Sequence, residues 1–472
     1  MKDTSFLDEI KTTLSFSGEI SHSLFSTVVG KSFKGITEHY HTIVSRQAVV
    51  KLSIFIRMLN IDSINQYFNS DLGKLVSFGK DVFYSIKNSS KINWRLCLLD
   101  QALKCSEQKE QRESPLRPHE IPCLIVDDTD LQKTGKCMEF IGRIFSHVGK
   151  GSILGFKSLN LALWTGTNLL HLDFSLHGEL GKKGDQGIRK RDLNKRFVKE
   201  RCEQSPGHLR AQEYFEKKTI VAIQMIGRAL KKGLTAQYIL ADSWFFNQRI
   251  VQLAIERGVH LISRPKNNNW IYVYKGRECT ISNLAKKFRS LQSRKVWKAM
   301  GLYYGELIVE FKGHPIKLFF YKESKRGSKW QVIATTNLRI GAKTGYKIYQ
   351  NRWSIEVSYK ELKQHLKFGA CQSRDFDGQL ADATQCLLAY NYLSSHKARH
   401  DYHTLGGLFK EISQSWFRPT IMQKFWDHVM TVIKKLARFV NVPVQELSNN
   451  LLRKDEFYTN IEKLMLVFAA ET

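Results

Sequence analysis

Two short apolar runs, each followed by aspartate, constrain the fold of this 472-residue chain most strongly. One covers residues 121–126 and precedes Asp127 and Asp128; the other covers 238–241 and precedes Asp242. Runs of this length that are rich in Ile, Leu and Val predict buried strands of a parallel sheet. Because ligands of open α/β sheets bind at the carboxyl ends of the strands, we expect an α/β fold with an acidic site at one sheet edge.

A third acidic residue lies within a predicted short helix near residues 349–363. At 100° per residue, Tyr349, Arg352, Glu356 and Lys363 would fall within roughly 60° of one another. A helix that packs against a core would carry leucines on this face, whereas this face carries a carboxylate, two cations and a phenol. The alternative is a polar helix face with an Arg352–Glu356 salt bridge. Two aspartates and a glutamate are hard oxygen ligands that suit a pair of Mg²⁺ ions beside phosphate groups.

The composition favours a polyanionic partner and a reducing compartment. Lys and Arg number 73 against 44 Asp and Glu, giving a formal charge of +29 that is spread through the chain. Such a charge is typical of proteins that bind nucleic acid. The eight cysteines are scattered without a CxxC pair, which argues against a zinc ribbon and indicates a reducing cytoplasm. No signal sequence and no membrane-spanning apolar run is expected.

These residues resemble the DDE transposases of bacterial insertion sequences, and in particular insertion-sequence family four. That family carries a YREK signature, in which Tyr, Arg, Glu and Lys are separated by two, three and six residues. Tyr349, Arg352, Glu356 and Lys363 fit every spacing. The first catalytic Asp of the family precedes Thr, as Asp128 precedes Thr129 here, and the second follows a hydrophobic strand, as Asp242 does.

The resemblance implies a DNA transposase that moves an insertion sequence by cutting and pasting. Asp128, Asp242 and Glu356 would be the catalytic residues and the ligands of two Mg²⁺ ions, for which Mn²⁺ can substitute. Because neighbouring residues of a strand face opposite ways, only one of Asp127 and Asp128 should reach the metals. The family context favours Asp128, and the choice between them stays open.

Further residues and partners follow from the same resemblance. Tyr349, Arg352 and Lys363 would contact DNA phosphates, and Trp330 would stack on a base flipped from the DNA end. The alternative for Trp330 is a core position at a strand edge. The partners would be double-stranded DNA, as terminal inverted repeats and target, and a second copy of the chain in a synaptic dimer. The protein would be cytoplasmic and associated with the bacterial nucleoid, and no membrane partner is expected.

The expected architecture is a ribonuclease-H-like α/β core with a β-rich insertion and helical regions at both ends. A helical DNA-binding region would cover 1–117, and the two halves of the core 118–265 and 331–400. The insertion would cover 266–330, which contains fifteen Lys and Arg but only four Glu. A helical region would cover 401–472. Within the core, residues 159–164 and 169–176 flank a Gly-containing turn and predict a hairpin.

Two other functions remain open at this stage. A metal-dependent nuclease that cuts DNA without rejoining it would share the same acidic core. A domesticated, non-catalytic DNA-binding protein would share the basic charge but would not need the acidic residues.

Overall fold

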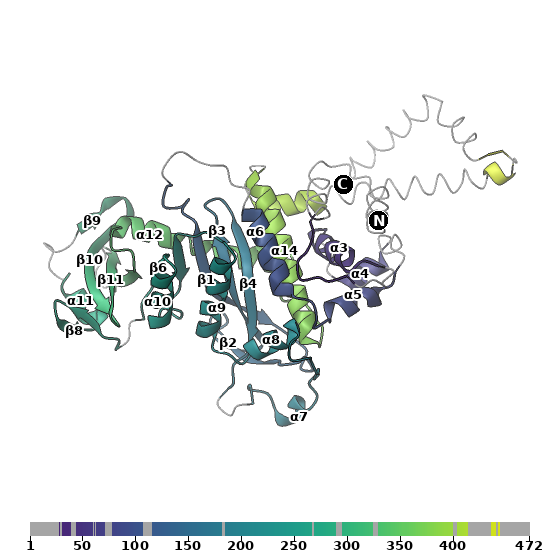
Figure 1. Ribbon diagram of the computed structural model, residues 1–472, viewed down its shortest axis with the longest axis horizontal. Helices are drawn as coiled ribbons and strands as arrows, with labels where there is room; N and C mark the ends of the chain where they lie inside the picture. Colours follow the sequence, from purple (N-terminus) through teal and green to yellow (C-terminus); the bar gives the residue numbers. More distant parts are fainter. Residues whose placement is uncertain are drawn as a thin grey trace.

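Twelve strands of the described chain hydrogen-bond into one mixed sheet, which the helices cover on both faces (Figure 1). The computed structural model describes residues 28, 31–38, 44–59, 61, 63–70, 78–106, 116–181, 185–266, 269–288, 295–323, 329–399, 404–413, 436–439 and 442–443. The strands are β1 (Cys123–Gln132), β2 (Gly142–Ser146), β3 (Gly151–Trp164), β4 (Leu169–His177), β5 (Tyr238–Ala241), β6 (His260–Ser263), β7 (Tyr272–Tyr274), β8 (Arg277–Cys279), β9 (Lys295–Trp297), β10 (Leu302–Phe311), β11 (His314–Glu323) and β12 (Gln331–Thr335).

The centre of the sheet has the order β4-β3-β1-β5-β6. Strand β3 runs antiparallel to both β1 and β4, whereas β1, β5 and β6 run parallel to one another. The predicted parallel strands before the aspartates are therefore confirmed, as is the predicted hairpin, whose turn covers 165–168. Beyond β6 the sheet continues through β12, β11 and β10, so the β-rich segment extends the central sheet.

The described helices lie on both faces of this sheet. They are α3 (Arg46–Met58), α4 (Ile64–Asn69), α5 (Lys80–Lys87), α6 (Trp94–Ser106), α7 (Lys190–Leu193), α8 (Pro206–Glu213), α9 (Lys218–Lys231), α10 (Gln248–Glu256), α11 (Ile281–Lys286), the 3-10 turn η3 (Lys298–Met300), α12 (Ala342–Gln350), α13 (Trp353–His365) and α14 (Phe376–Arg399). Among them, none combines the length and the apolar character needed to cross a membrane. Most of the predicted C-terminal helical region, 401–472, lies outside the described residues.

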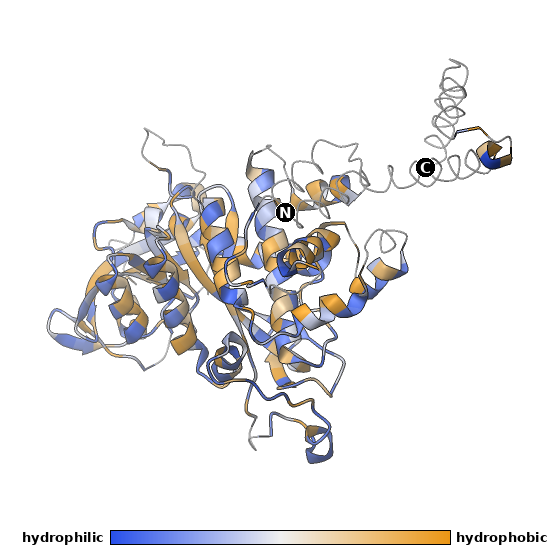
Figure 2. Ribbon diagram, turned by 45° about the vertical axis from the view of Figure 1, so that its right-hand side comes forward, coloured by the Kyte–Doolittle hydropathy of each residue, from blue (hydrophilic) through white to orange (hydrophobic). Residues whose placement is uncertain are grey.

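Strand β1 separates two hydrophobic cores because its side chains alternate between the faces of the sheet. Cys123 and Ile125 belong to the core that contains α3, α5, α13 and α14. Leu124 and Val126 belong to the second core, with α9, α10 and the β-rich segment. Figure 2 shows the hydrophobic residues gathered on these central elements, whereas α7 and its loop are largely hydrophilic. The two cores define which face each acidic residue of the site occupies.

A buried ion cluster joins the N-terminal helices to the central helix α14. Asp382 of α14 pairs with Arg57 of α3 and with Lys87 of α5, and all three side chains are largely buried. Although burial opposes ionisation, the two cations keep the pKa of Asp382 well below its usual range. Helices α3 and α5 are therefore fixed to the core by charge as well as by apolar packing.

Candidate active site

Asp127 and Asp242 lie beside each other on the face of the sheet that α13 covers. The parallel register pairs Val126 with Ala241, so the next residues, Asp127 and Asp242, follow at the same level. Alternation places both on the side of Ile125 and Leu240, in the core that also contains Ile355 and Tyr359 of α13. Glu356 is on the same helix, α13. The geometry thus brings Asp127, Asp242 and Glu356 to one face.

Asp127 is electrostatically close to every other carboxylate of the site. Burial raises its pKa to about 8; Arg352 opposes this shift, while Asp128, Asp242 and Glu356 add to it. Burial likewise raises the pKa of Asp242, and the nearby Asp128 carboxylate adds to the effect. Such crowding of acidic groups is a typical feature of functional sites and would be relieved by a bound cation.

Asp128 faces the opposite side of the sheet, toward α9. Its carboxylate forms an ion pair with Lys218, the first residue of that helix. Val126, two residues earlier in the same orientation, packs in the core formed with α9. Each aspartate thus has a cation nearby: Asp128 pairs with Lys218, and the Arg352 guanidinium lies 3.9 Å from the Asp127 carboxylate.

The four signature residues lie on two helices rather than on the single helix that the spacing predicts. Helix α12 ends at Gln350 and α13 begins at Trp353. The intervening Asn351 and Arg352 keep helical dihedral angles, so the chain continues in nearly the same direction. Arg352 donates to Glu356 at 2.6 Å and lies 5.8 Å from the centre of the Tyr349 ring. The spacing therefore still brings these three side chains together.

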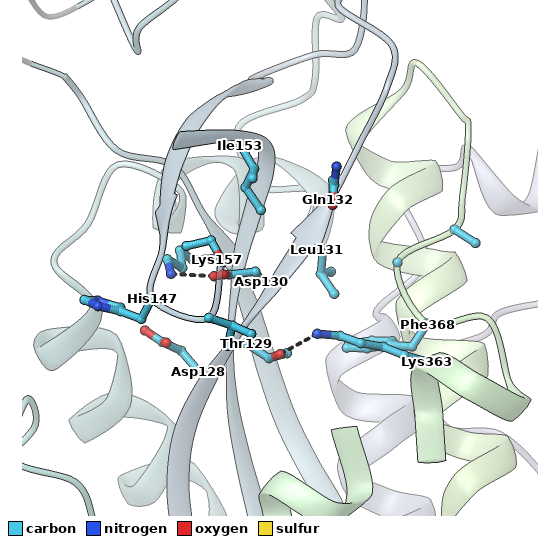
Figure 3. A pocket seen from close by; sticks show the side chains of 14 residues that line it. Asp128, Thr129, Asp130, Leu131, Gln132, His147, Ile153, Lys157, Lys363 and Phe368 are labelled. Carbon is cyan, nitrogen blue, oxygen red and sulfur yellow. Dashed lines mark hydrogen bonds and ion pairs between the residues drawn. The ribbon is translucent and has the colours of Figure 1, made fainter. Parts of the chain in front are cut away.

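Lys363 and Tyr349 connect the signature to the two strands. Lys363 donates to the Thr129 hydroxyl at 2.7 Å, and the Tyr349 hydroxyl lies 3.5 Å from the Ala241 carbonyl oxygen. Lys363 and Asp128 both line a cleft of 540 Å³ that is shown in Figure 3. The other lining residues are Thr129, Asp130, Leu131, Gln132, Ser146, His147, Val148, Ile153, Lys157, Phe368, Gly369 and Ala370. Lys157 in this cleft is paired with Asp130.

The donor atoms of the site fit a hard divalent cation in their chemistry. Asp127, Asp242 and Glu356 offer only carboxylate oxygens, which Mg²⁺ prefers. Within the described residues, however, no three Asp, Glu, His or Cys side chains are arranged as a ready metal site. Glu356 is held by Arg352. A metal bound by this carboxylate would compete with its ion pair to Arg352.

Hydrogen bonds fix the segment that follows Asp242. The Asp242 carboxylate accepts from the backbone N–H of Trp244 at 2.8 Å, and Asn247 caps α10 by accepting from Ile250. On the neighbouring strand β6, the Ser263 hydroxyl donates to the Asp242 carbonyl oxygen at 3.0 Å. The position of Asp242 is thus determined by both its own loop and strand β6.

Trp330 and Trp244 have different environments. Trp330 packs against the second core, with its ring 5.8 Å from Phe288 and 6.4 Å from Phe320. Trp244, which the sequence reasoning did not single out, is 53% exposed directly after Asp242. The sequence does show an aromatic residue two positions after Asp242. It does not show that Trp244 is exposed while the next two residues, Phe245 and Phe246, are buried.

Two family descriptions match overlapping parts of the chain. Residues 218–392, which include Asp242 and Glu356, match the family described as "Transposase DDE domain". Residues 102–278, which include Asp127, Asp128 and Asp242, match the family described as "DDE superfamily endonuclease". No curated protein matches the chain.

Among solved structures, the NurA nuclease from Sulfolobus solfataricus is 13% identical and is matched over 60% of this chain and 84% of its own. Its TM-score of 0.23 is too low to support an argument about fold or function. The two family matches together run from residue 102 to residue 392, and on them the chain is an enzyme of the DDE transposase and endonuclease superfamily.

Proposed function

We propose that this enzyme is a cut-and-paste DNA transposase of the YREK type, with Asp127, Asp242 and Glu356 as its catalytic carboxylates. One observation carries the proposal: two aspartates on adjacent parallel strands face the helix that holds Glu356, and a signature arginine contacts that glutamate. The strand order β4-β3-β1-β5-β6, with only β3 reversed, supports a ribonuclease-H-like core.

The first ligand is the point at which structure and family context differ. The Asp-Thr context favours Asp128, but Asp128 faces α9 and pairs with Lys218. Asp127 shares a face with Asp242 and α13, and burial, followed by the charges of Asp128, Asp242 and Glu356, raises its pKa. We therefore infer that Asp127 is the ligand, while the role of Asp128 as a ligand stays a prediction that mutation can decide.

The remaining signature residues, Tyr349, Arg352 and Lys363, are suited to binding the phosphate groups of DNA. When bound by the carboxylates, Mg²⁺ would activate the attacking oxygen and stabilise the leaving oxygen. Arg352 and Lys363 would neutralise phosphate charge, and Tyr349 would hold the Arg352 guanidinium against its ring. Hydrolysis frees a 3′-hydroxyl, whose oxygen then bonds to a target phosphorus as the P–O3′ bond of the target breaks. The chain would supply alignment through these side chains.

The proposal extends to partners and regions. The DNA would be the terminal inverted repeats and the target, held by a homodimer whose N-terminal helical region, 1–117, reads the repeat. Residues 118–265 and 331–400 would form the core, 266–330 a DNA-contacting insertion, and 401–472 a helical tail. The excess of Lys and Arg over 266–330 lies between the strands, because strands β7 to β11 themselves hold four Lys and Arg and four Glu.

A cleavage and joining assay tests the function directly. The DNA would carry the sequences that flank the native coding region, with labelled ends and either Mg²⁺ or Mn²⁺. A transposase should produce nicks, released ends and products joined to an unlabelled target plasmid. Cleavage without any joined product would favour the nuclease alternative, and binding without cleavage the non-catalytic one.

The affinity for duplex DNA is expected to fall steeply with salt, because the +29 charge implies many phosphate contacts. For 6–10 contacts, the loss between 50 and 200 mM salt should be about 10³–10⁵-fold, with a slope near −0.9 per contact. Fluorescence anisotropy over this range measures it. Lys363→Met should reduce the slope by about 0.9, whereas the exposed control Lys231→Met should not. A flat dependence would assign the charge to solubility.

Replacing Trp330 with alanine separates its two interpretations. Its packing against Phe288 and Phe320 predicts a loss of about 2 kcal/mol in unfolding free energy, measured as a lower thermal midpoint. The base-stacking hypothesis predicts instead near-normal nicking, few hairpin ends and an unchanged midpoint. Denaturing gels of nicked and hairpin products, run beside a thermal melt of the same preparation, show which holds.

A further inference from the structure

An aromatic ring stands exposed beside the proposed catalytic carboxylates. Trp244 is 53% exposed, although a side chain of this size normally buries most of its surface. The segment that carries Trp244 is anchored, because the Trp244 backbone N–H donates to Asp242 and the next residues, Phe245 and Phe246, are buried. The indole is therefore presented to solvent by a well-anchored segment at the carboxyl end of β5.

Two lysines from different parts of the chain converge on this ring. The ammonium of Lys266 lies 4.5 Å from the ring centre and that of Lys218 lies 5.5 Å away. Lys218 is also the partner of Asp128, so that carboxylate holds it beside the indole. A flat apolar surface bordered by two cations offers stacking to a nucleobase and charge to the phosphates on either side of it.

We propose that Trp244, Lys218 and Lys266 bind one nucleotide of the DNA strand that enters the active site. The base stacks on the indole, and the flanking phosphates take the two ammonium groups. Because an exposed cation–π contact is weaker than base stacking on an aromatic ring, the nucleotide can displace a lysine from the ring. Asp128 then acts as a positioning residue that keeps Lys218 near this nucleotide. The proposal rests on the function proposed above, since it requires DNA at the carboxylates.

A double-mutant cycle between protein and DNA tests the stacking. The probes are duplexes from the native flanking DNA, each lacking one base near the cleavage point, bound without divalent metal so that no strand is cut. For the wild type, one abasic position should weaken binding about 5- to 100-fold. For Trp244→Leu, intact DNA should bind more weakly by a similar factor, and the abasic site at that position should cause no further loss.

Matched variants assign the effect to the ring and to the charges. Trp244→Phe keeps an aromatic surface and should retain most of the dependence on the base. Lys218→Met and Lys266→Met should weaken intact and abasic DNA alike, because they act on phosphates. Leu209→Ala, on α8 and 52% exposed, should behave as the wild type. Asp128→Asn should resemble Lys218→Met if it holds that lysine.

The outcomes distinguish this site from the proposed function. If Trp244→Leu shows the same abasic dependence as the wild type, the stacking site is wrong, whatever the cleavage assay gives. If Trp244→Leu melts at a lower temperature, the test is read from Trp244→Phe and the lysine variants. Wild-type affinity in both lysine variants, or a complete loss of the abasic effect in Trp244→Phe, then overturns the site. If the abasic effect depends on Trp244 but the protein fails to cut DNA in the presence of either Mg²⁺ or Mn²⁺, the stacking site stands and the transposase proposal is wrong.

Discussion

Replacing Asp127 with asparagine is expected to reduce DNA cleavage by about 10³-fold or more, since losing a ligand of a catalytic metal removes several kcal/mol of transition-state stabilisation. Asp242→Asn and Glu356→Gln should have the same effect, because the three carboxylates share one face of the sheet. The measurement is the initial rate of nicking at saturating protein. DNA affinity in the same preparations should be nearly unchanged, because the carboxylates repel phosphates rather than bind them.

Asp128→Asn is the matched control for this experiment. It removes one carboxylate from the adjacent position of the same strand, but on the face occupied by Lys218. We expect a smaller effect on nicking and a larger one on DNA affinity, because Lys218 loses its partner. The reverse order, with Asp128→Asn inactive and Asp127→Asn active, would restore Asp128 as the first ligand.

Replacing Asp382 with alanine should destabilise the protein by about 3–5 kcal/mol, because Arg57 and Lys87 would remain buried without their counter-ion. Chemical denaturation followed by circular dichroism measures the change. Asp81→Ala, which removes an exposed carboxylate from the first turn of α5, should cost about 1 kcal/mol or less. A similar small cost for Asp382→Ala would show that the buried cluster contributes little to stability.

The acid dependence of the same variant has a definite sign. The pKa of Asp382 is lowered in the folded state, so its contribution is present above the unfolded value of about 3.9 and is lost as the pH falls below it. The stability difference between wild type and Asp382→Ala should therefore be full at neutral pH. It should shrink progressively in acid below about pH 4.

Local patterns predicted the strands of the core, and for a clear physical reason. The apolar runs before Asp127 and Asp242 and the turn at 165–168 each determine their own backbone conformation, so no distant contact was needed. Strand β1 nevertheless continues to Gln132, beyond the aspartates, because β3 pairs along its whole length. Partner strands of this kind are set by tertiary structure, which the run of residues does not contain.

The details of the site depended on contacts between distant segments. The alternation of side chains along a strand predicts that Asp127 and Asp128 face opposite sides of the sheet. Only the packing of α13 on one side and α9 on the other shows which helix each aspartate faces. Arg57 and Asp382 are 325 positions apart, and neither has a local signal for its partner. The YREK spacing correctly predicted that Tyr349, Arg352 and Glu356 lie together. It did so because Asn351 and Arg352, between α12 and α13, keep helical dihedral angles.

The union of the β-rich segment with the central sheet has a mechanical consequence. Strand β12 bonds to β11 on one side and to β6 on the other, where Ala334 pairs with Ser263. That serine holds the carbonyl oxygen of Asp242. A force applied by DNA to the outer strands would therefore reach Asp242, a proposed catalytic carboxylate, through the hydrogen-bonded backbones of β12 and β6. Binding of DNA to the outer strands and the position of Asp242 would thus be coupled through this one contact between β12 and β6.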